Sequence, residues 1–433
     1  MQFRRVFFLL LVLVFSFGSS GYQTERETPP YYRLELSGLN KRITNEAGSF
    51  PEYLTVSRLI ERFMARWELK GVSLAVVRDD RLVFAQGFGI ANDQMQAVEP
   101  GHLFRLASVS KLITAIGIMK LVEAGRLSLD DRVFGPAGIL KHPALEHVTD
   151  KKLYNITVRD LLVHAGGWTQ RYGDPAFLPT VIAKRVGDKP PVGMESYYKF
   201  IASSRLHFAP GTMVSYSNMG YMFLGEVIRE VSGEPYESYI RKSILIPNGI
   251  SDMHIGSSYR DSCFSNEVQY FEQPGSPLIP ECNGSGRLVK KSDGGNSVEL
   301  LGAAGGWVAS SVELARLLTL IDGKREVHDI LSRRSILEMT EDTYGKGPLG
   351  WMSVTGKGDW IRTGNMPGTS AMVRRQANGI SWVFLTNSSC WKGPKLSGNI
   401  ERLMDRIIRR IDLWPERDLF QYYPISTLGI AGK

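Results

Sequence analysis

An α/β fold of the α+β type, with an antiparallel β-sheet flanked by helices and an inserted, mostly helical lobe, is the architecture that the sequence predicts. Segments rich in apolar and β-branched residues occur near both ends of the chain, at about 70–92 and 349–388, and are typical of strands. The stretch from about 126 to 300 shows helical spacing and loop composition instead. We therefore expect the two sets of strands to form one sheet, with the middle segment inserted as a helical lobe.

Local signals define the elements of the N-terminal half. A short helix is expected over about 54–68, followed by two strands that a turn at 79–80 joins into a hairpin. Further along, Thr157 and Asp160 have the spacing of a capping box, which predicts a short helix that Gly166 can end.

Two longer helices are predicted around the polar motifs discussed below. The first contains Lys111, has apolar residues at helical spacing from Leu112 to Met119 and ends near Gly125. The second follows Tyr216 and ends at Gly233.

The C-terminal half combines loops, strands and one last helix. Residues 259–298 are the most loop-like part, and we expect them to border the cleft. The four segments between 349 and 388 are separated by Gly, Asn and Asp, which predicts an antiparallel meander. A final helix carries an apolar stripe over 400–411.

Composition fits a large globular protein. The chain has 433 residues, of which 43% are hydrophobic and 22% charged, so it can bury a sizeable core. The formal net charge is +8, but basic residues alternate with acidic ones rather than forming a block. This pattern gives little support to nucleic-acid binding.

The N-terminus resembles a secretory signal peptide. Residues 1–20 combine a charged start, a short apolar run and small residues, and we expect cleavage near Ser20. The run is too short to span a bilayer, although a retained anchor is the alternative. The expected organisation is then an extended lead-in at 21–50, one large domain at 51–412 and a tail at 413–433. The sequence predicts export to the periplasm or beyond, with no stable membrane span after cleavage.

The cysteines and histidines give no sign of a cofactor. In an exported chain Cys263 and Cys282 can close a short loop as a disulfide, whereas Cys390 is expected to be a small buried residue. Cys, His and carboxylate residues nowhere cluster at metal-ligand spacing, and His164 is interpreted as a structural residue at a helix end. We expect neither a metal nor another cofactor.

The segment Ser108-Val109-Ser110-Lys111 is the strongest candidate for chemistry. Residues three apart share one face of a helix, so the Lys111 amine can reach the Ser108 hydroxyl. A helix N-terminus also disfavours an extra proton on Lys111 and favours an oxyanion at Ser108. The pair therefore has the composition of a nucleophile with its own base.

Two further motifs follow in order. Tyr216-Ser217-Asn218 precedes a helix, for which Ser and Asn are also ordinary capping residues, and Arg362-Thr363-Gly364 lies in a predicted strand. Together the three motifs resemble those of the class C β-lactamase and penicillin-binding-protein-like serine hydrolases, which read S-x-x-K, Y-x-N, and K-T-G or H-x-G. The resemblance, with further segments such as "ITVRDLLVHAGGW" and "AAGGWVASSVELARLL", covers roughly residues 55–410.

The resemblance implies the same fold, with the active site between the sheet and the helical lobe, and a role for each motif residue. Ser108 attacks a carbonyl, Lys111 accepts its proton, and Tyr216 is the second candidate base and the acid for the leaving group. Asn218 holds the substrate amide or the Lys111 ammonium. The backbone N–H groups of Asn365 and Ser108 form the oxyanion hole.

The third motif departs from the family because Arg362 replaces Lys or His. Arginine keeps the positive charge and can bind a substrate carboxylate as a planar fork, but it does not exchange protons near neutral pH. Thr363 and Gly364 would continue an edge strand beside the substrate. The alternative interpretation is an ordinary exposed arginine on a strand.

Two classes of function remain open on the sequence. The first is an exported serine hydrolase that forms an acyl-enzyme with a small-molecule or peptide substrate: a β-lactam, a D-amino-acid peptide or a small ester. The second is a binding or sensor protein that keeps the fold without turnover. The complete set of Ser108, Lys111 and Tyr216 favours the enzyme.

Overall fold

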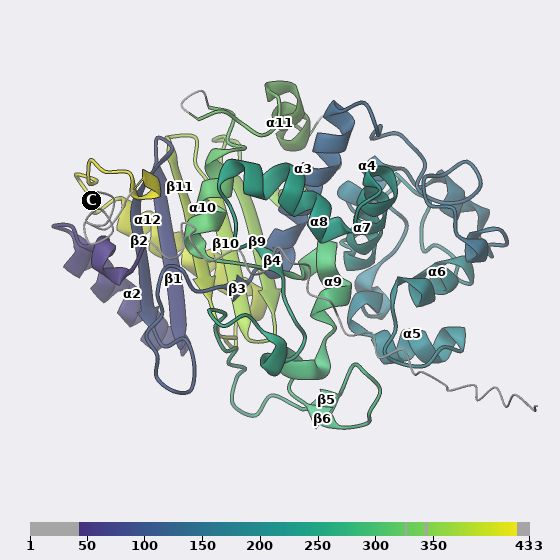
Figure 1. Ribbon diagram of the computed structural model, residues 1–433, viewed down its shortest axis with the longest axis horizontal. Coiled ribbons are helices and arrows are strands. Elements are labelled where there is room, and N and C mark those ends of the chain that lie inside the picture. The colour runs from purple at the N-terminus through teal and green to yellow at the C-terminus, as the bar shows by residue number, and fades with distance from the viewer. Residues whose placement is uncertain (1–42, 325–326, 343–344, 422–433) are drawn as a thin grey trace, which may run out of the picture. The chain divides into compact units, whose positions relative to one another are not determined.

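The predicted antiparallel sheet is present and is built from both ends of the chain. The computed structural model describes residues 43–324, 327–342 and 345–421. Its main sheet has the strand order β2-β1-β11-β10-β9-β8 (Figure 1), and every neighbouring pair is antiparallel. The strands are β1 (Gly71–Arg78), β2 (Arg81–Gly89), β8 (Ser353–Val354), β9 (Trp360–Met366), β10 (Thr369–Arg375) and β11 (Ile380–Thr386).

Alternation along β1 explains why both faces of this sheet are covered. Leu74 and Val76 belong to one hydrophobic cluster, which also includes the apolar stripes of α2 (Tyr53–Trp67) and α12 (Ser397–Ile408). Ala75 and Val77 point into a second cluster on the opposite face. There α10 (Ser311–Thr319) lies against β1 and β11, as Figure 1 shows.

The inserted region is mostly helical, as predicted, but it also contains short strands. Its helices pack around α3, which is buried almost all round rather than on a single stripe. The strands β3, β7 and β4 form a small second sheet, and β5 pairs with β6. The elements are β3 (Phe104–Arg105), α3 (Ser110–Glu123), α4 (Val158–Leu162), α5 (Pro179–Val186), α6 (Met194–Ala202), α7 (Asn218–Ser232), α8 (Tyr236–Ile240), β4 (His254–Ile255), β5 (Ile279–Pro280), β6 (Leu288–Val289), α9 (Val298–Gly305), β7 (Trp307–Ala309) and α11 (Arg333–Thr340).

Two local predictions need correction. The capping box of Thr157 and Asp160 is present, but α4 ends at Leu162, before Gly166. The chain leaves the helix there because His164 adopts a left-handed conformation with φ 61°. In the predicted meander, only 353–354 of the first segment pair as a strand.

The cysteines do not pair. Cys263, Cys282 and Cys390 are all free thiols, so the disulfide between the first two is not formed. The Cys263 Sγ instead donates a hydrogen bond to the backbone oxygen of Tyr259, 3.4 Å away. Cys390 is buried in the cluster beneath α12, as expected for a small apolar side chain.

The predicted signal peptide at 1–20 lies outside the described residues, as do most of the lead-in and the last part of the tail. At the end of the lead-in, 45–48 form a short 3₁₀ helix. Among the residues that the structure describes, none of the helices is both long and apolar enough to cross a membrane.

Candidate active site

Ser108 lies on a single 3₁₀ turn between a strand and a long helix. Strand β3 ends at Arg105, the turn covers Ala107–Val109, and α3 begins at Ser110. Ala107 is held at φ 46°, a left-handed conformation that is strained for a residue with a side chain. The turn leaves Ser108 half-buried, while the residues on either side are buried.

Lys111, in the first turn of α3, lies directly behind the serine. Its Nζ is 3.4 Å from Ser108 Oγ, 2.6 Å from Asn218 Oδ1 and 2.5 Å from the backbone oxygen of Ala304. Burial lowers the pKa of the Lys111 amine; the positive charge of Arg362 lowers it further, although Tyr216 opposes both effects. The amine is therefore closer to its neutral, basic form than an exposed lysine.

Tyr216 contacts the same serine from the segment that precedes α7. Its hydroxyl donates a hydrogen bond of 2.5 Å to Ser108 Oγ, and its ring packs at a tilt of 37° against His164 with centroids 4.4 Å apart. Burial alone raises the pKa of the Tyr216 hydroxyl, but the nearby charges of Lys111 and Arg362 outweigh burial and lower it. His164 lies just beyond the end of α4, where the sequence placed it, and its ring is a direct neighbour of Tyr216.

Ser217 and Asn218 fit both interpretations of their motif. Ser217 caps α7, because its hydroxyl accepts a hydrogen bond from the backbone N–H of Gly220 at 3.1 Å. Asn218 is buried at the first position of the helix and contacts Lys111. Ser217 therefore caps the helix, and the adjacent Asn218 contacts the lysine.

Arg362 on β9 is buried against the nucleophile rather than exposed on a strand. Arg362 is only 2% exposed, and its Nε donates a 2.7 Å hydrogen bond to the backbone oxygen of Ser108. Its Nη2 is buried and has no hydrogen-bond partner among the described residues. The interpretation of an ordinary exposed arginine is therefore wrong.

The remaining residues of the third motif bring β9 onto the turn of Ser108. A Cβ placed on Gly364 would lie 2.2 Å from the backbone oxygen of Leu106 and 2.7 Å from the backbone nitrogen of Ser108. Thr363 is half-buried, and the Asn365 side chain accepts a 2.6 Å hydrogen bond from Ser370. Only glycine permits this approach of the two backbones.

All three motifs meet at one cavity of about 320 Å³ between the sheet and the helical lobe, the size of a small ligand site. Lys111 is not among the lining residues, but its Nζ is 3.4 Å from Oγ of Ser108, which is. The sequence did not predict several of the lining residues, because those that come from loops or contribute only backbone atoms belong to no recognisable motif. The lining residues are Ser108, Gln170, Phe177, Tyr216, Asn218, Leu301, Ala304, Gly305, Met352, Arg362, Thr363, Gly364, Asn365, Met366 and Pro394.

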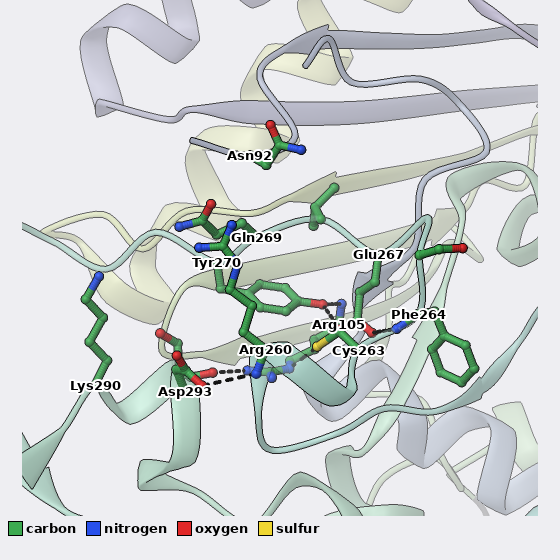
Figure 2. Close-up of a pocket in the computed structure, with 13 residues that line it drawn as sticks. Asn92, Arg105, Arg260, Cys263, Phe264, Glu267, Gln269, Tyr270, Lys290 and Asp293 are labelled. Carbon is green, nitrogen blue, oxygen red and sulfur yellow. Dashed lines mark hydrogen bonds and ion pairs between the residues drawn. The ribbon is translucent and has the colours of Figure 1, made fainter. Parts of the chain in front are cut away.

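A second polar cavity, of about 310 Å³, is built around Arg105 (Figure 2). The guanidinium of Arg105 donates to the backbone oxygens of Ser292 at 2.6 Å and Ser257 at 2.7 Å, and it lies over the Tyr270 ring. The Tyr270 hydroxyl in turn donates to Glu267 at 2.6 Å. These contacts fasten the long loop after β4 to the strand that leads to Ser108.

No metal centre accompanies the serine in the described part of the chain. Within residues 43–324, 327–342 and 345–421, no group of three or more His, Cys, Asp or Glu side chains is placed to hold a metal ion.

The chain is similar to several known proteins. Protein flp of Staphylococcus aureus (strain COL) is 28% identical over 256 residues, which is 56% of this chain and 45% of that protein. A putative D-alanyl-D-alanine carboxypeptidase of Escherichia coli (strain K12) is 28% identical over 191 residues, 42% of each chain. This chain thus matches less than half the length of either curated relative.

Among solved structures, the D-amino acid amidase of Ochrobactrum anthropi superposes with a TM-score of 0.61. The match covers 82% of this chain and 98% of the amidase at 21% identity, so it supports the fold. The Beta-lactamase family matches residues 56–402, which include all three motifs. The chain belongs to the Beta-lactamase family.

Proposed function

We propose that this protein is a serine hydrolase that forms a covalent acyl-enzyme on Ser108 and cleaves an amide or ester. The observation that carries the proposal is the shared contact on one oxygen: Ser108 Oγ is 2.5 Å from the Tyr216 hydroxyl and 3.4 Å from the Lys111 amine. A serine hydroxyl is a weak nucleophile until an adjacent base accepts its proton. Here two groups with lowered pKa stand within reach.

The reaction follows from these contacts. The Ser108 oxygen attacks the carbonyl carbon, its proton passes to Lys111, and the carbonyl π electrons move to the oxygen. Tyr216 donates a proton to the leaving amine or alcohol as the tetrahedral species collapses. A water molecule then attacks the ester of Ser108, and Tyr216, deprotonated in the previous step, accepts the proton of that water. Lys111 returns its proton to Ser108 Oγ as the second tetrahedral species collapses, which releases the acid and restores the serine.

The oxyanion requires donors close to the nucleophile. We assign this role to the backbone N–H groups of Ser108 and Asn365, because Gly364 brings β9 within contact distance of the Ser108 backbone nitrogen. Export of the chain, as the sequence of 1–20 predicts, is part of the proposal. N-terminal sequencing of the protein from the periplasm or medium tests it, with cleavage expected near Ser20.

Among substrates we favour a D-amino-acid amide or a small ester over a peptide with a free terminal carboxylate. Arg362 is the only charged side chain lining the cavity in the described part of the chain. Its Nε is bonded to Ser108 and its Nη2 is buried, so it cannot present a full fork to a carboxylate. The names of the amidase and carboxypeptidase relatives support the D-amino-acid class.

A serine-directed fluorophosphonate probe tests the nucleophile. We expect wild type to be labelled and Ser108→Ala not to be, with Ser110→Ala as the matched control that retains labelling. Ser110 is the adjacent serine, whose hydroxyl accepts a hydrogen bond from the Trp307 backbone. An unlabelled but folded wild type would contradict the enzyme and support the sensor alternative.

Turnover distinguishes the substrates. We expect hydrolysis of D-alanine amide and of a nitrophenyl ester to exceed that of a D-Ala-D-Ala peptide and of a chromogenic cephalosporin. L-alanine amide is the stereochemical control. Preference for the dipeptide carboxylate would contradict the substrate class while leaving the acyl-enzyme mechanism in place.

A further inference from the structure

A carboxylate outside the three motifs, Asp174, contacts the site through Asn218. The amide of Asn218 lies between two partners: its Oδ1 accepts a 2.6 Å hydrogen bond from Lys111, and its Nδ2 donates a 2.6 Å hydrogen bond to Asp174 Oδ2. We propose that Asp174 is a positioning residue, which fixes the orientation of the Asn218 amide and so keeps the Lys111 lone pair directed at Ser108. This inference rests on the proposed function.

Asp174 is itself held firmly. It precedes a 3₁₀ turn, Pro175–Phe177, and its Oδ1 accepts the backbone N–H of Ala176 at 3.0 Å. Its Oδ2 accepts hydrogen bonds from both Asn218 and Gln170, each 2.6 Å long. Since an ionised carboxylate only accepts hydrogen bonds, it must face the NH₂ side of the Asn218 amide.

The orientation of the amide decides what Lys111 can do. A neutral amine has two N–H donors and one lone pair. Two carbonyl oxygens, Asn218 Oδ1 at 2.6 Å and Ala304 O at 2.5 Å, take both donors. The lone pair then remains for Ser108 Oγ, 3.4 Å away, whose own proton is free because Tyr216 donates to that oxygen.

A rotated amide would remove this arrangement. With the NH₂ group of Asn218 toward Lys111, the neutral amine would have to accept that hydrogen bond with its lone pair. The lysine could then no longer accept the Ser108 proton. In the wild-type orientation the transfer balances: the proton moves from Oγ to Nζ, and the Oγ electron pair forms the bond to the substrate carbon.

Asp174 also has an electrostatic effect, which experiment can separate from the geometric one. The charged and titratable groups around Lys111 include Tyr216, Arg362, Asp174, His164 and Tyr221. The negative charge of Asp174 raises the pKa of the amine. Loss of that charge alone would lower the pKa and move the acidic limb of the pH profile to lower pH. Loss of amide orientation instead lowers the rate at the plateau.

The test compares Asp174→Ala and Asp174→Asn with wild type by acylation rate, using the fluorophosphonate probe and a nitrophenyl ester. We expect Asp174→Ala to reduce the plateau of kcat by about tenfold or more, with KM nearly unchanged, which is part of the roughly 10²–10⁴-fold that general-base catalysis typically contributes. Asp174→Asn retains one acceptor and should restore part of the rate. The matched control is Asp188→Ala, which removes another carboxylate of the helical lobe, bonded to Lys199 and Ser196.

A double-mutant cycle shows whether Asp174 acts through Asn218. Once Asn218→Ala has removed the amide, Asp174→Ala should cause little further loss, so the two effects should be strongly non-additive. Additive losses, or a shifted limb with an unchanged plateau, would overturn the inference while the proposed function stands. A folded wild type that the fluorophosphonate probe does not label would overturn the proposed function itself. This result would be seen before any Asp174 variant is compared.

Discussion

At the scale of single residues, Arg362 is the feature that separates this site from the pattern of its family. At the first position of the third motif, the family pattern has lysine or histidine, and this chain has an arginine that cannot lose its proton near neutral pH. The structure uses that cation to hold the Ser108 backbone at 2.7 Å and to place a fixed positive charge near Lys111 and Tyr216. A fixed charge makes the pKa of its neighbours independent of its own titration.

This leads to a prediction for Arg362→Gln. The positive charge lowers the pKa of both Lys111 and Tyr216, so its removal raises the pKa of whichever group acts as base. The basic form is then reached only at higher pH. We expect the acidic limb of kcat/KM for a nitrophenyl ester to move to higher pH than in wild type.

The companion variant Arg362→Lys separates charge from geometry. Lysine keeps the positive charge but not the guanidinium N–H that contacts Ser108. Its acidic limb should stay near that of wild type, while its maximal rate falls. A limb for Arg362→Gln that moves to lower pH, or does not move, is incompatible with this account.

The sequence predicted the side chains that meet at Ser108 but not the groups that orient them. Ser108, Lys111 and Tyr216 carry recognisable types at recognisable spacing. Asp174 lies in a loop without a motif, and Ala304 contributes a backbone oxygen that any residue could supply. The environment of Arg362 was also missed, because burial depends on contacts across 254 positions of sequence.

At the scale of elements, the approach of β9 to the 3₁₀ turn assembles the site. Its closest point is Gly364, where a Cβ would meet three backbone atoms of 106–109 at 3.0 Å or less. Backbone atoms on both sides cannot move apart without separating the strand from the nucleophile. The close approach of β9 to the 3₁₀ turn of Ser108 thus requires that residue 364 have no Cβ.

We therefore expect Gly364→Ala to lower the acylation rate sharply and to destabilise the fold by roughly 1–3 kcal/mol, the usual cost of overpacking. Gly356→Ala, in the loop between β8 and β9, is the matched control, since a Cβ there meets nothing within 4 Å. Probe labelling and urea unfolding of the two variants measure the effects. Equal behaviour of the two alanines would show that the close approach is unimportant.

Long elements were predictable from local pattern, and very short ones were not. The helix at 54–68 and the hairpin around 79–80 appear where apolar spacing and turn residues put them. The strands β3, β4 and β7 have two or three residues, too few to show a period. They form because the nucleophile segment, the loop after α8 and the chain after α9 are brought together by tertiary packing.

At the scale of the whole molecule, the sequence predicted one sheet from its two ends but not how the lobe is joined to it. Val72 of β1 is paired with Thr386 of β11, so the sheet closes around the insertion. One junction is Glu313 on α10, the helix that covers the sheet. It accepts hydrogen bonds from the backbone N–H groups of Ser251 and Asp252, which lead into β4.

Glu313 makes global stability depend on pH. It is fully buried, and burial, assisted by the negative charge of Asp252, raises its pKa from 4.5 to about 7. Below about pH 4.5 the carboxyl is protonated in both the folded and the unfolded chain. Between 4.5 and 7 the unfolded chain ionises first, so the free energy of unfolding falls by roughly 1.4 kcal/mol per pH unit from this group.

His254, another titratable neighbour of Glu313, acts in the same direction. Burial lowers its pKa, but the hydrogen bonds to Asp252, at 3.1 Å, and to Glu237 together outweigh burial and raise it. The stabilising charge of His254 is therefore also lost as pH rises. Urea unfolding of wild type should therefore give a lower free energy at pH 8 than at pH 5. In Glu313→Gln, which cannot ionise, the decrease should be smaller.

Glu61→Gln on the exposed face of α2 makes the same charge change without burial and should retain the wild-type slope. Parallel slopes for wild type and Glu313→Gln would show instead that ionisation of this junction has no part in holding the lobe to the sheet.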